Sequence, residues 1–373
     1  FARKRGPKHP IARVRNPEYN DRSLGFMRQQ LNLSMSINPE LLTAQELFNI
    51  LKVPSAVKIE YFSGRNFEMA ELRLREDSIL DGIRLIDLQK KYHTRVLICA
   101  VARQGETIIP SGDFTLRAGD KIYLTAAPRE LEKFFRLLGV FRARASSVMI
   151  VGASKMCYYL ASELLEMGMS VKIIDQNEQR CVEMSEKLPR ALVIVGDGTD
   201  SELLSEEGIS QTDAFVAITG LDEANILMAL SAAKQSGDCC KVVAKINRKS
   251  LLELVSTESL IDSVVSTGAV TTELILQYIR AMKNASASKV KTLHRIVDEK
   301  VEALEFSVTP DTSFAGVPLR DLNLKRGLLL AGIVRQNGQI VIPSGNDVLH
   351  LHDDVIVVTT DTQLEDLRDI LAE

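Results

Sequence analysis

The residues best suited to chemistry lie in VMIVGASKMCYYLA, residues 148–161, where an apolar run meets a helical pattern at Gly152. A strand that turns at a glycine into a helix can hold a phosphate with free backbone N–H groups and the helix dipole. Of the dinucleotide pattern G-x-G-x-x-G only Gly152 is kept, because Ser154 and Cys157 replace the other two glycines. Ser154 obstructs the approach of a pyrophosphate, and Cys157 adds bulk between helix and strand. The pattern predicts a phosphate site that is weakened or lost.

A carboxylate follows where such a site needs one. Asp175 ends the next apolar run, SVKIID, and a carboxylate at this place can accept both ribose hydroxyls. Gly196 and Asp197 follow the third run, and Thr219 follows the fourth. Since the carboxyl ends of parallel strands meet at one edge of a sheet, these residues are predicted to converge on one crevice, where open α/β sheets bind ligands.

Two interpretations of this crevice stay open. In the first, the Gly152 turn and Asp175 bind a nucleotide. In the second, the fold is degenerate and empty, Gly152 makes only a tight turn, and Asp222 caps the helix that follows Thr219.

Short β-branched runs alternate with helical patterns between residues 147 and 265, which predicts βαβ units and a Rossmann-like, doubly wound parallel sheet. The runs are apolar throughout, as expected of strands that helices cover on both faces. A helix is predicted over Ala269–Lys283, and a linker over Asn284–Lys291. The predicted strands read VMIVG, SVKIID, ALVIVGD, DAFVAIT, CKVVAKI and DSVVS.

The chain also repeats itself. GETIIPSGDFTLRAGDKIYL, residues 105–124, is similar to GQIVIPSGNDVLHLHDDVIV, residues 338–357. The same offset places the start of the first repeat about 85 residues before Phe1. The predicted domains are the C-terminal remnant of a first Rossmann domain (1–55), a small α+β domain (56–139), a second Rossmann domain (147–283) and a second small α+β domain (293–373).

Each small domain carries a turn signal between two strands, Gln104-Gly105 in the first and Asn337-Gly338 in the second, which is typical of a hairpin. The elements predicted for the second small domain are strands at 301–308, 328–335, 339–342 and 354–359, a short helical turn at 318–322 and a helix at 362–372.

Catalytic residues are harder to find, because the sequence offers no convincing acid, base or nucleophile and has no histidine between residues 147 and 265. His350-x-His352, followed by two aspartates, can place two imidazoles on one strand face as a metal site does. Arg117 and Gly119 stand at the equivalent places of the first repeat, which favours a solvated turn. No catalytic residue and no metal site is predicted.

The composition narrows the class of protein. The 46 Lys+Arg and 49 Asp+Glu give a net charge of -3, which offers no global attraction to nucleic acid or anionic lipid. Five cysteines, an odd number, favour a reducing cytoplasm over a disulfide scaffold. No apolar run approaches the roughly 18 residues of a membrane-spanning helix. These features predict a soluble chain, for which any membrane role must work through a protein partner.

Taken together, VMIVGASKMCYYLA, VKIID, VIVGDGTD, DAFVAITGLDEANILMALSAAK and AKINR resemble the RCK, or KTN, nucleotide-binding domain (RCK-N) of potassium channels and transporters. The small domains, with IPSG and AGDKIYL or HDDVIVV, resemble the RCK C-terminal domain (RCK-C, also called TrkA-C). The order RCK-N, RCK-C, RCK-N, RCK-C is that of the regulatory subunits of Trk-type bacterial potassium uptake systems. The resemblance covers essentially the whole chain.

This resemblance implies a cytoplasmic, non-catalytic regulator at the inner face of the plasma membrane. It implies that the chain senses NAD(H) or ATP/ADP, gates potassium transport through a TrkH-type membrane subunit, and forms a homodimer or higher homo-oligomer. It also implies the residues that contact the nucleotide. These are Gly152, Ala153, Ser154, Lys155 and Met156 in the phosphate loop, Asp175 at the ribose, and Gly196, Asp197 and Thr219 along the adenosine side.

Helices at Leu41–Lys52 and Ala269–Lys283 are, by the same resemblance, candidates for contacts with a second copy, while packing within one chain is equally compatible with them. Two other functions also stay open. An NAD-dependent oxidoreductase is disfavoured because no acid or base stands beside the crevice. A non-binding structural scaffold is favoured by Ser154 and Cys157.

Overall fold

The computed structural model describes residues 9–14, 33–52, 55–56, 58–62, 67–141, 145–237, 240–255, 261–284, 290–296, 300–361 and 364–372. Close packing divides the chain into two units, one of residues 1–54 and 144–272 and one of residues 55–143 and 273–373. Within the described residues, none of the helices combines the length and the apolar character needed to cross a lipid bilayer.

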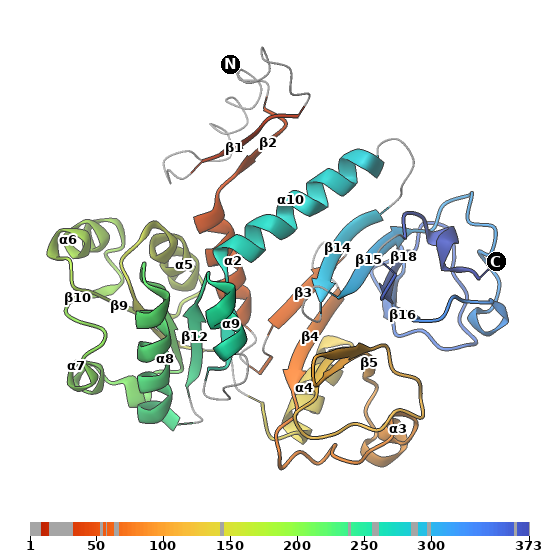
Figure 1. Ribbon diagram of the computed structural model, residues 1–373, viewed down its shortest axis with the longest axis horizontal. Coiled ribbons are helices and arrows are strands. Elements are labelled where there is room, and N and C mark those ends of the chain that lie inside the picture. Colours follow the sequence, from red (N-terminus) through yellow and green to blue (C-terminus); the bar gives the residue numbers. More distant parts are fainter. Residues whose placement is uncertain are drawn as a thin grey trace. The chain divides into compact units, whose positions relative to one another are not determined.

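The first unit contains a six-stranded sheet in which all neighbouring strands are parallel (Figure 1). The strand order, β10-β9-β8-β11-β12-β13, runs outward from β8 in both directions, so the carboxyl ends of β8 and β11 flank the switch point of a doubly wound sheet. The predicted fold class is confirmed. The strands are β8 (Ser147–Val151), β9 (Ser170–Asp175), β10 (Leu192–Val195), β11 (Ala214–Ala217), β12 (Lys241–Lys245) and β13 (Ser263–Val265).

Helices cover both faces of this sheet, which explains why its strands are apolar throughout. One core joins the sheet to α5 and α6 and includes Leu160 and Val216, both fully buried. The other core joins the opposite face to α7, α8 and α9 and includes Phe215 and Met228. The helices are α5 (Lys155–Glu166), α6 (Glu178–Lys187), α7 (Ser201–Glu206), η3 (Ile209–Gln211), α8 (Asp222–Ser236), α9 (Lys249–Val255) and α10 (Thr267–Asn284), the last of which continues into the second unit.

The N-terminal residues add a parallel pair of strands, β1 (Ile11–Arg13) and β2 (Met35–Ile37), followed by α2 (Pro39–Lys52). Leu47 and Leu51 of α2 are fully buried in the same core as α5. Nearby, Nδ2 of Asn38 donates a hydrogen bond of 2.9 Å to the hydroxyl of Tyr159. The helix predicted at Leu41–Lys52 therefore packs within its own chain.

The second unit consists of two five-stranded antiparallel sheets with the same order, β3-β4-β7-β5-β6 and β14-β15-β18-β16-β17. Their paired elements confirm the two small α+β domains. The first sheet contains β3 (Lys58–Phe62), β4 (Phe67–Arg73), β5 (Leu97–Arg103), β6 (Glu106–Ile108) and β7 (Lys121–Thr125), with helices α3 (Leu85–Tyr92) and α4 (Pro128–Leu137). The second contains β14 (Val290–Ile296), β15 (Val301–Ser307), β16 (Leu328–Val334), β17 (Ile340–Val341) and β18 (Asp354–Thr359), with 3-10 turns η5 (Leu319–Asp321) and η6 (Leu367–Ile370).

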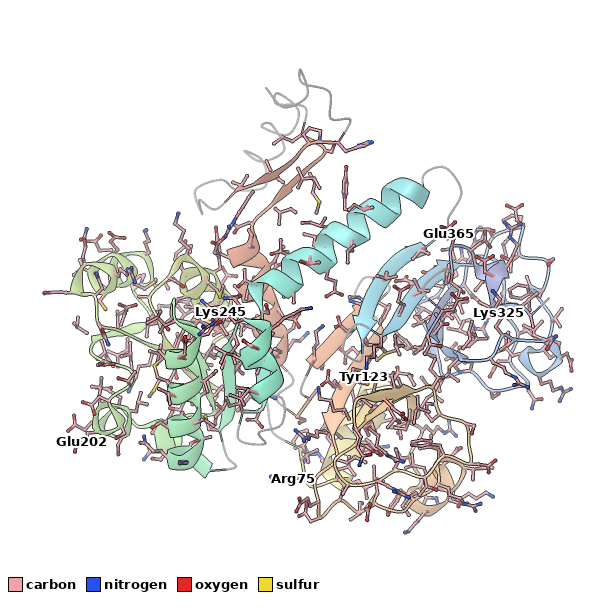
Figure 2. The ribbon with its side chains drawn as sticks, viewed as in Figure 1. Arg75, Tyr123, Glu202, Lys245, Lys325 and Glu365 are labelled. Carbon is pink, nitrogen blue, oxygen red and sulfur yellow. The ribbon has the colours of Figure 1, made fainter. Side chains whose placement is uncertain are left out.

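The two sheets share one apolar core inside this unit. Phe67, Cys99 and Tyr123 of the first sheet cluster with Ala303 and Ile356 of the second. Tyr123 stands on the central strand β7 of the first domain (Figure 2). The repeat in the sequence therefore corresponds to two similar sheets that cover each other.

The predicted linker between α10 and the second small domain needs correction, and part of it lies outside the described residues. The linker predicted at Asn284–Lys291 is too long, because β14 already begins at Val290 and pairs there with Phe306 of β15. Residues 285–289 lie outside the described residues. The division into four domains stays a prediction.

The helix predicted at residues 362–372 is wrong, because its place is taken by the single turn η6. Leu371 is extended and bridges Leu324, and the amide of Lys325 donates to the carbonyl of Ile370 at 2.9 Å. Pairing with the segment after η5 thus ends the helix after one turn. The apolar spacing of Leu367 and Ile370 suits that turn as well as a helix.

Candidate functional site: the crevice at the carboxyl ends of β8, β9 and β11

Gly152 makes the turn from β8 into α5 with a φ of +113, which a side chain would strain. A Cβ at this position would lie 3.0 Å from the amide nitrogen of Thr219 and 3.1 Å from the carbonyl carbon and oxygen of Ile218. Glycine is thus required for two reasons, the backbone angle and the close passage of the chain that leaves β11. The predicted residues Gly152 and Thr219 do come together.

The first turn of α5 is capped by the side chain of the residue before it. Ser154 is the N-cap residue, and its Oγ accepts the amide of Cys157 at 3.3 Å. The Cys157 side chain is fully buried in the core between helix and sheet, where burial and the charge of Asp175 raise the pKa of its thiol. The two residues that replace glycines therefore serve the stability of the turn.

The two remaining residues of the loop, Lys155 and Met156, differ in the exposure of their side chains. The Met156 side chain is buried in the core, whereas that of Lys155 is exposed. The amides of both residues precede that of Tyr158, which donates to the carbonyl of Ser154 at 3.0 Å. The amides of Lys155 and Met156 can therefore be offered to an anion at the helix N-terminus.

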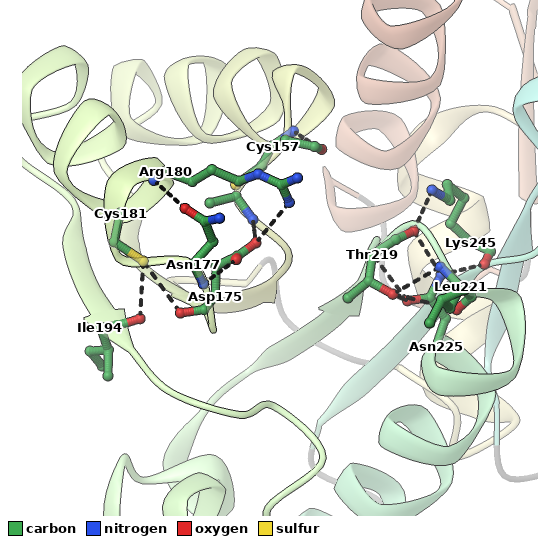
Figure 3. Close-up of polar contacts among 12 residues, drawn as sticks. Cys157, Asp175, Asn177, Arg180, Cys181, Ile194, Thr219, Leu221, Asn225 and Lys245 are labelled. Atoms are coloured by element: carbon green, nitrogen blue, oxygen red, sulfur yellow. Dashed lines mark hydrogen bonds and ion pairs between the residues drawn. The ribbon is translucent and has the colours of Figure 1, made fainter.

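Asp175 joins the ends of β9 and β8. Its Oδ2 accepts the amide of Ala153 at 2.7 Å and its Oδ1 accepts the amide of Asn177 at 2.8 Å (Figure 3). The guanidinium of Arg180, on the first turn of α6, lies 4.0 Å from Oδ2. The side chain of Asp175 is 11% exposed, and a carboxylate has more acceptor positions than these contacts occupy. It can therefore accept further donors at the carboxyl end of β9.

On the other side of the turn, Thr219 is fixed by a buried asparagine. Oδ1 of Asn225 accepts the amide and the hydroxyl of Thr219 at 2.9 and 2.7 Å, and its Nδ2 donates to the carbonyl of Lys245 at 2.9 Å. The ammonium of Lys245 donates to the carbonyl of Thr219 at 2.5 Å (Figure 3). Burial lowers the pKa of Lys245, and the charges of Asp222 and Glu40 partly offset this effect. The network makes the end of β11 rigid.

The end of β10 supplies the third side. The amide of Gly196 donates to the carbonyl of Asp175 at 3.0 Å, so this residue adjoins β9. Oδ1 of Asp197 accepts the amide and hydroxyl of Thr199 at 2.9 and 2.7 Å, and these bonds lower the pKa of the Asp197 carboxyl. Asp197 is exposed and bound into its own turn, so Gly196 is the residue of this pair that touches the β9 end directly.

The predicted role of Asp222 is wrong. Asp222 is the first residue of α8, after an N-cap at Leu221, and its Oδ2 accepts the amides of Asn247 and Arg248 at 3.0 and 2.9 Å. The carboxylate thus binds the chain that leaves β12 and makes no cap hydrogen bond to its own helix.

His350 and His352 of the second small domain are exposed, and neither belongs to the group of possible metal ligands found among the described residues. His350 and His352 lie in a turn, where His352 has a φ of +69, and Nδ1 of His350 is 2.9 Å from Nη1 of Arg335. The predicted solvated turn is the better description.

The sequence did not predict three side chains that lie at these strand ends, namely Arg180, Asn225 and Lys245. Arg180 is visible in the sequence as a cation on the first turn after Asp175. Asn225 and Lys245 carry no local signal, because their roles depend on the pairing of β11 with β12.

The sequence matches two protein-family models. The TrkA-N domain model matches residues 148–267. The TrkA-C domain model matches twice, at residues 69–139 and 303–372. Among curated proteins, the Trk system potassium uptake protein TrkA homolog 2 of Methanosarcina mazei is 31% identical over 93% of this chain and 75% of its own length.

The chain belongs to the TrkA family.

Other TrkA relatives include the Trk system potassium uptake protein TrkA homolog of Archaeoglobus fulgidus, 31% identical over 99% of this chain and 80% of the relative. The TrkA of Vibrio alginolyticus is 29% identical over 94% of this chain and 74% of the relative. Among solved structures, the GsuK RCK domain has a TM-score of 0.54 and 18% identity, and covers 96% of this chain and 74% of that chain. The GsuK channel bound to NAD has a TM-score of 0.53 and 18% identity, and the match covers 96% of this chain and 62% of the channel chain. These structures share the fold.

Proposed function

We propose that this TrkA-family chain is a cytoplasmic, non-catalytic regulatory subunit of a Trk-type potassium uptake system, which binds NAD(H) or ATP/ADP in the crevice of its Rossmann sheet. It acts on a TrkH-type membrane subunit from the inner face of the plasma membrane, as a homodimer or larger homo-oligomer. The names of the TrkA relatives support the link to potassium uptake.

The observation that carries the nucleotide proposal is the placement of Asp175. Its carboxylate, at the end of β9, binds the amide of Ala153 in the turn that Gly152 makes. A ribose held by Asp175 brings its phosphates over the amides of Lys155 and Met156 at the start of α5. Arg180 adds a positive charge beside the carboxylate. Gly196 and Thr219 then line the adenosine side.

The scaffold alternative also has an observation in its favour. Ser154 takes the Cys157 amide, and Asp175 takes the Ala153 amide, so two donors that a phosphate can use already have acceptors in the chain. A nucleotide must compete with these bonds or use the neighbouring amides. The choice between sensor and scaffold therefore depends on measured affinity.

Titration calorimetry of the chain with ATP, ADP, NAD and NADH tests nucleotide binding. We expect micromolar affinity for at least one of them, reduced at least about tenfold by Asp175→Ala, which removes a charge-assisted hydrogen bond worth roughly 1.5–3 kcal/mol. Asp213→Ala is the matched control. Asp213 accepts the amides of Ser146 and Ser147 at 2.8 and 2.9 Å, but at the start of β8, the opposite end of the sheet.

An unchanged affinity in Asp175→Ala, or an equal loss in Asp213→Ala, overturns the assigned site. Absence of binding by any of the four nucleotides makes the crevice a scaffold. Turnover of NADH with a carbonyl substrate instead supports an oxidoreductase. Potassium flux through the reconstituted transporter, with and without the bound nucleotide, tests regulation, because a ligand alters gating only if it binds two conformations with different affinity.

A further inference from the structure

Three side chains able to bind a metal ion meet inside the second unit, far from the nucleotide crevice in the sequence. Nδ1 of His294, on β14, lies 2.8 Å from Oε2 of Glu60, on β3, and 3.0 Å from Oε1 of Glu273, on α10. The three ligand atoms all lie within 4.8 Å of one another. The side chains of Glu60, His294 and Glu273 are 9%, 14% and 25% exposed. This cluster is therefore largely shielded from solvent.

The cluster occupies related places in the two small domains. Glu60 pairs with Met69 across β3 and β4, and His294 pairs with Ala303 across β14 and β15, the corresponding strands of the repeat. The packing of one sheet on the other brings these equivalent positions together above their shared core. A group bound here links both domains and α10 at once.

The surroundings hold the cluster in place. The ring of Phe62 lies edge to face with the imidazole of His294, with 4.7 Å between ring centroids. Lys58 forms an ion pair with the other oxygen of Glu60, Oε1, which leaves Oε2 as the oxygen that faces His294.

One imidazole nitrogen and two carboxylate oxygens are a ligand set of the zinc type. Zn²⁺ binds such ligands at about 2.0–2.2 Å, which spaces the ligand atoms of a tetrahedral site by roughly 3.3 Å. The observed 2.8 and 3.0 Å require only small side-chain movements to reach that spacing. An imidazole ligand favours Zn²⁺ over Ca²⁺ and Mg²⁺, which take oxygen ligands. We propose that Glu60, Glu273 and His294 bind one Zn²⁺-type ion that joins the two small domains and α10, with water completing its coordination.

A proton is the competing occupant. Burial alone lowers the pKa of His294, but the charge of Glu60 and the hydrogen bond to Glu273 outweigh it and raise the pKa to about 10. An imidazolium between two carboxylates thus satisfies the same residues. The experiment must distinguish a metal site from this proton-bridged cluster.

Equilibrium dialysis of the purified chain against Zn²⁺, followed by elemental analysis, measures the site directly. We expect one tightly bound Zn²⁺ per chain, little competition from a large excess of Mg²⁺ or Ca²⁺, and a higher melting temperature with Zn²⁺. His294→Gln and the more exposed Glu273→Gln are each expected to weaken binding at least about tenfold, since even outer partners of metal ligands contribute that much.

His350→Gln is the matched control, because His350 also lies beside a carboxylate, that of Asp353 at 3.6 Å. It is expected to leave Zn²⁺ binding unchanged. X-ray absorption at the zinc edge should give nitrogen and oxygen neighbours near 2.0 Å, whereas cysteine sulfur near 2.3 Å identifies a different site. Equal binding by wild type and His294→Gln, sulfur ligands, or the absence of tight binding overturns the proposal and leaves the cluster as a proton bridge. Because Glu273 is more exposed than His294, a loss of Zn²⁺ binding in Glu273→Gln shows that the loss in His294→Gln is not due to misfolding.

Discussion

The two small domains of the second unit have the same strand order but differ in what surrounds it. Both keep a buried aspartate paired with an arginine beside the hairpin. Asp120 accepts Nε and Nη2 of Arg103, each at 2.7 Å, while Asp353 accepts Nη1 of Arg335. Their final segments differ, because the first domain forms the helix α4 and the second only the turn η6. Both repeats thus keep an ion pair in which the loss of one residue leaves the other charge unpaired. They differ in the final segment, whose structure depends on the residues packed against it.

The shared core shows a second kind of difference. Phe67 of β4 lies against Gly332 of β16, whereas the corresponding positions of the repeat hold Val301 and Ala100 in the same core. The pair of a large residue and a glycine, Phe67 and Gly332, thus corresponds in the repeat to valine and alanine. The comparison suggests that the total volume is preserved although the individual residues are not.

Removing the buried aspartates has the largest expected effect. Asp120 is 1% exposed, and Asp120→Ala leaves Arg103 without its carboxylate and the amide of Arg117 without its acceptor at 2.8 Å. We expect the unfolding free energy to fall by about 3–5 kcal/mol. Asp353→Ala should cost less, because Asp353 accepts one guanidinium nitrogen instead of two.

Calorimetric melting temperatures of the two variants measure this difference, and hydrogen exchange locates the affected sheet. A larger loss in Asp353→Ala contradicts the comparison. Losses below about 1 kcal/mol in both variants mean that these pairs behave like exposed salt bridges.

The unequal pair in the shared core predicts a smaller effect. A Cβ at Gly332 would lie 2.1 Å from Cε2 of Phe67, so Gly332→Ala overpacks the core at a cost of about 1–3 kcal/mol. Phe67→Val should also destabilise by leaving a cavity. The double variant converts this pair to the residue types of Val301 and Ala100, and should lose less than the sum of its parts by at least about 0.5 kcal/mol.

Melting temperatures of the double-mutant cycle provide the measurement. Ala100→Gly is the control, since it changes the equivalent position without adding volume. Simple additivity of Phe67→Val and Gly332→Ala contradicts the idea that the two residues compensate each other.

The sequence predicted those features that depend on neighbouring residues. Apolar runs gave the strands of the parallel sheet, and the position of Asp175 at the end of a run placed it beside the Gly152 turn. The predictions failed where distant chain decides the structure. Pairing with Leu324 holds Leu371 extended, so η6 does not continue as a helix. Likewise, Glu60 and His294 meet because one sheet packs on the other, and Glu273 joins them from α10.

A second turn of each domain, Ser111–Phe114 in the first and Ser344–Asp347 in the second, predicts the smallest effect, one that depends on pH. Asp347 accepts the hydroxyl and the amide of Ser344, both at 2.7 Å, and these bonds lower the pKa of its carboxyl. In the first domain Phe114 occupies this place of the turn, its amide bonded to the carbonyl of Ser111 as that of Asp347 is to Ser344. Because the folded pKa lies below the unfolded value, the stabilisation is present above the unfolded value of 3.8 and is lost as pH falls through the folded pKa.

Asp347→Asn should therefore lower the unfolding free energy by about 0.5 kcal/mol at pH 7, a figure reduced by solvent screening, with the difference from wild type disappearing in strong acid. Melting curves between pH 2 and 7 measure it. Asp113→Asn is the matched control, since the first domain carries its aspartate one position earlier in the equivalent turn. If both variants follow the same pH profile, the Ser344 bonds do not cause the effect. In that case the two turns are electrostatically equivalent despite their different sequences.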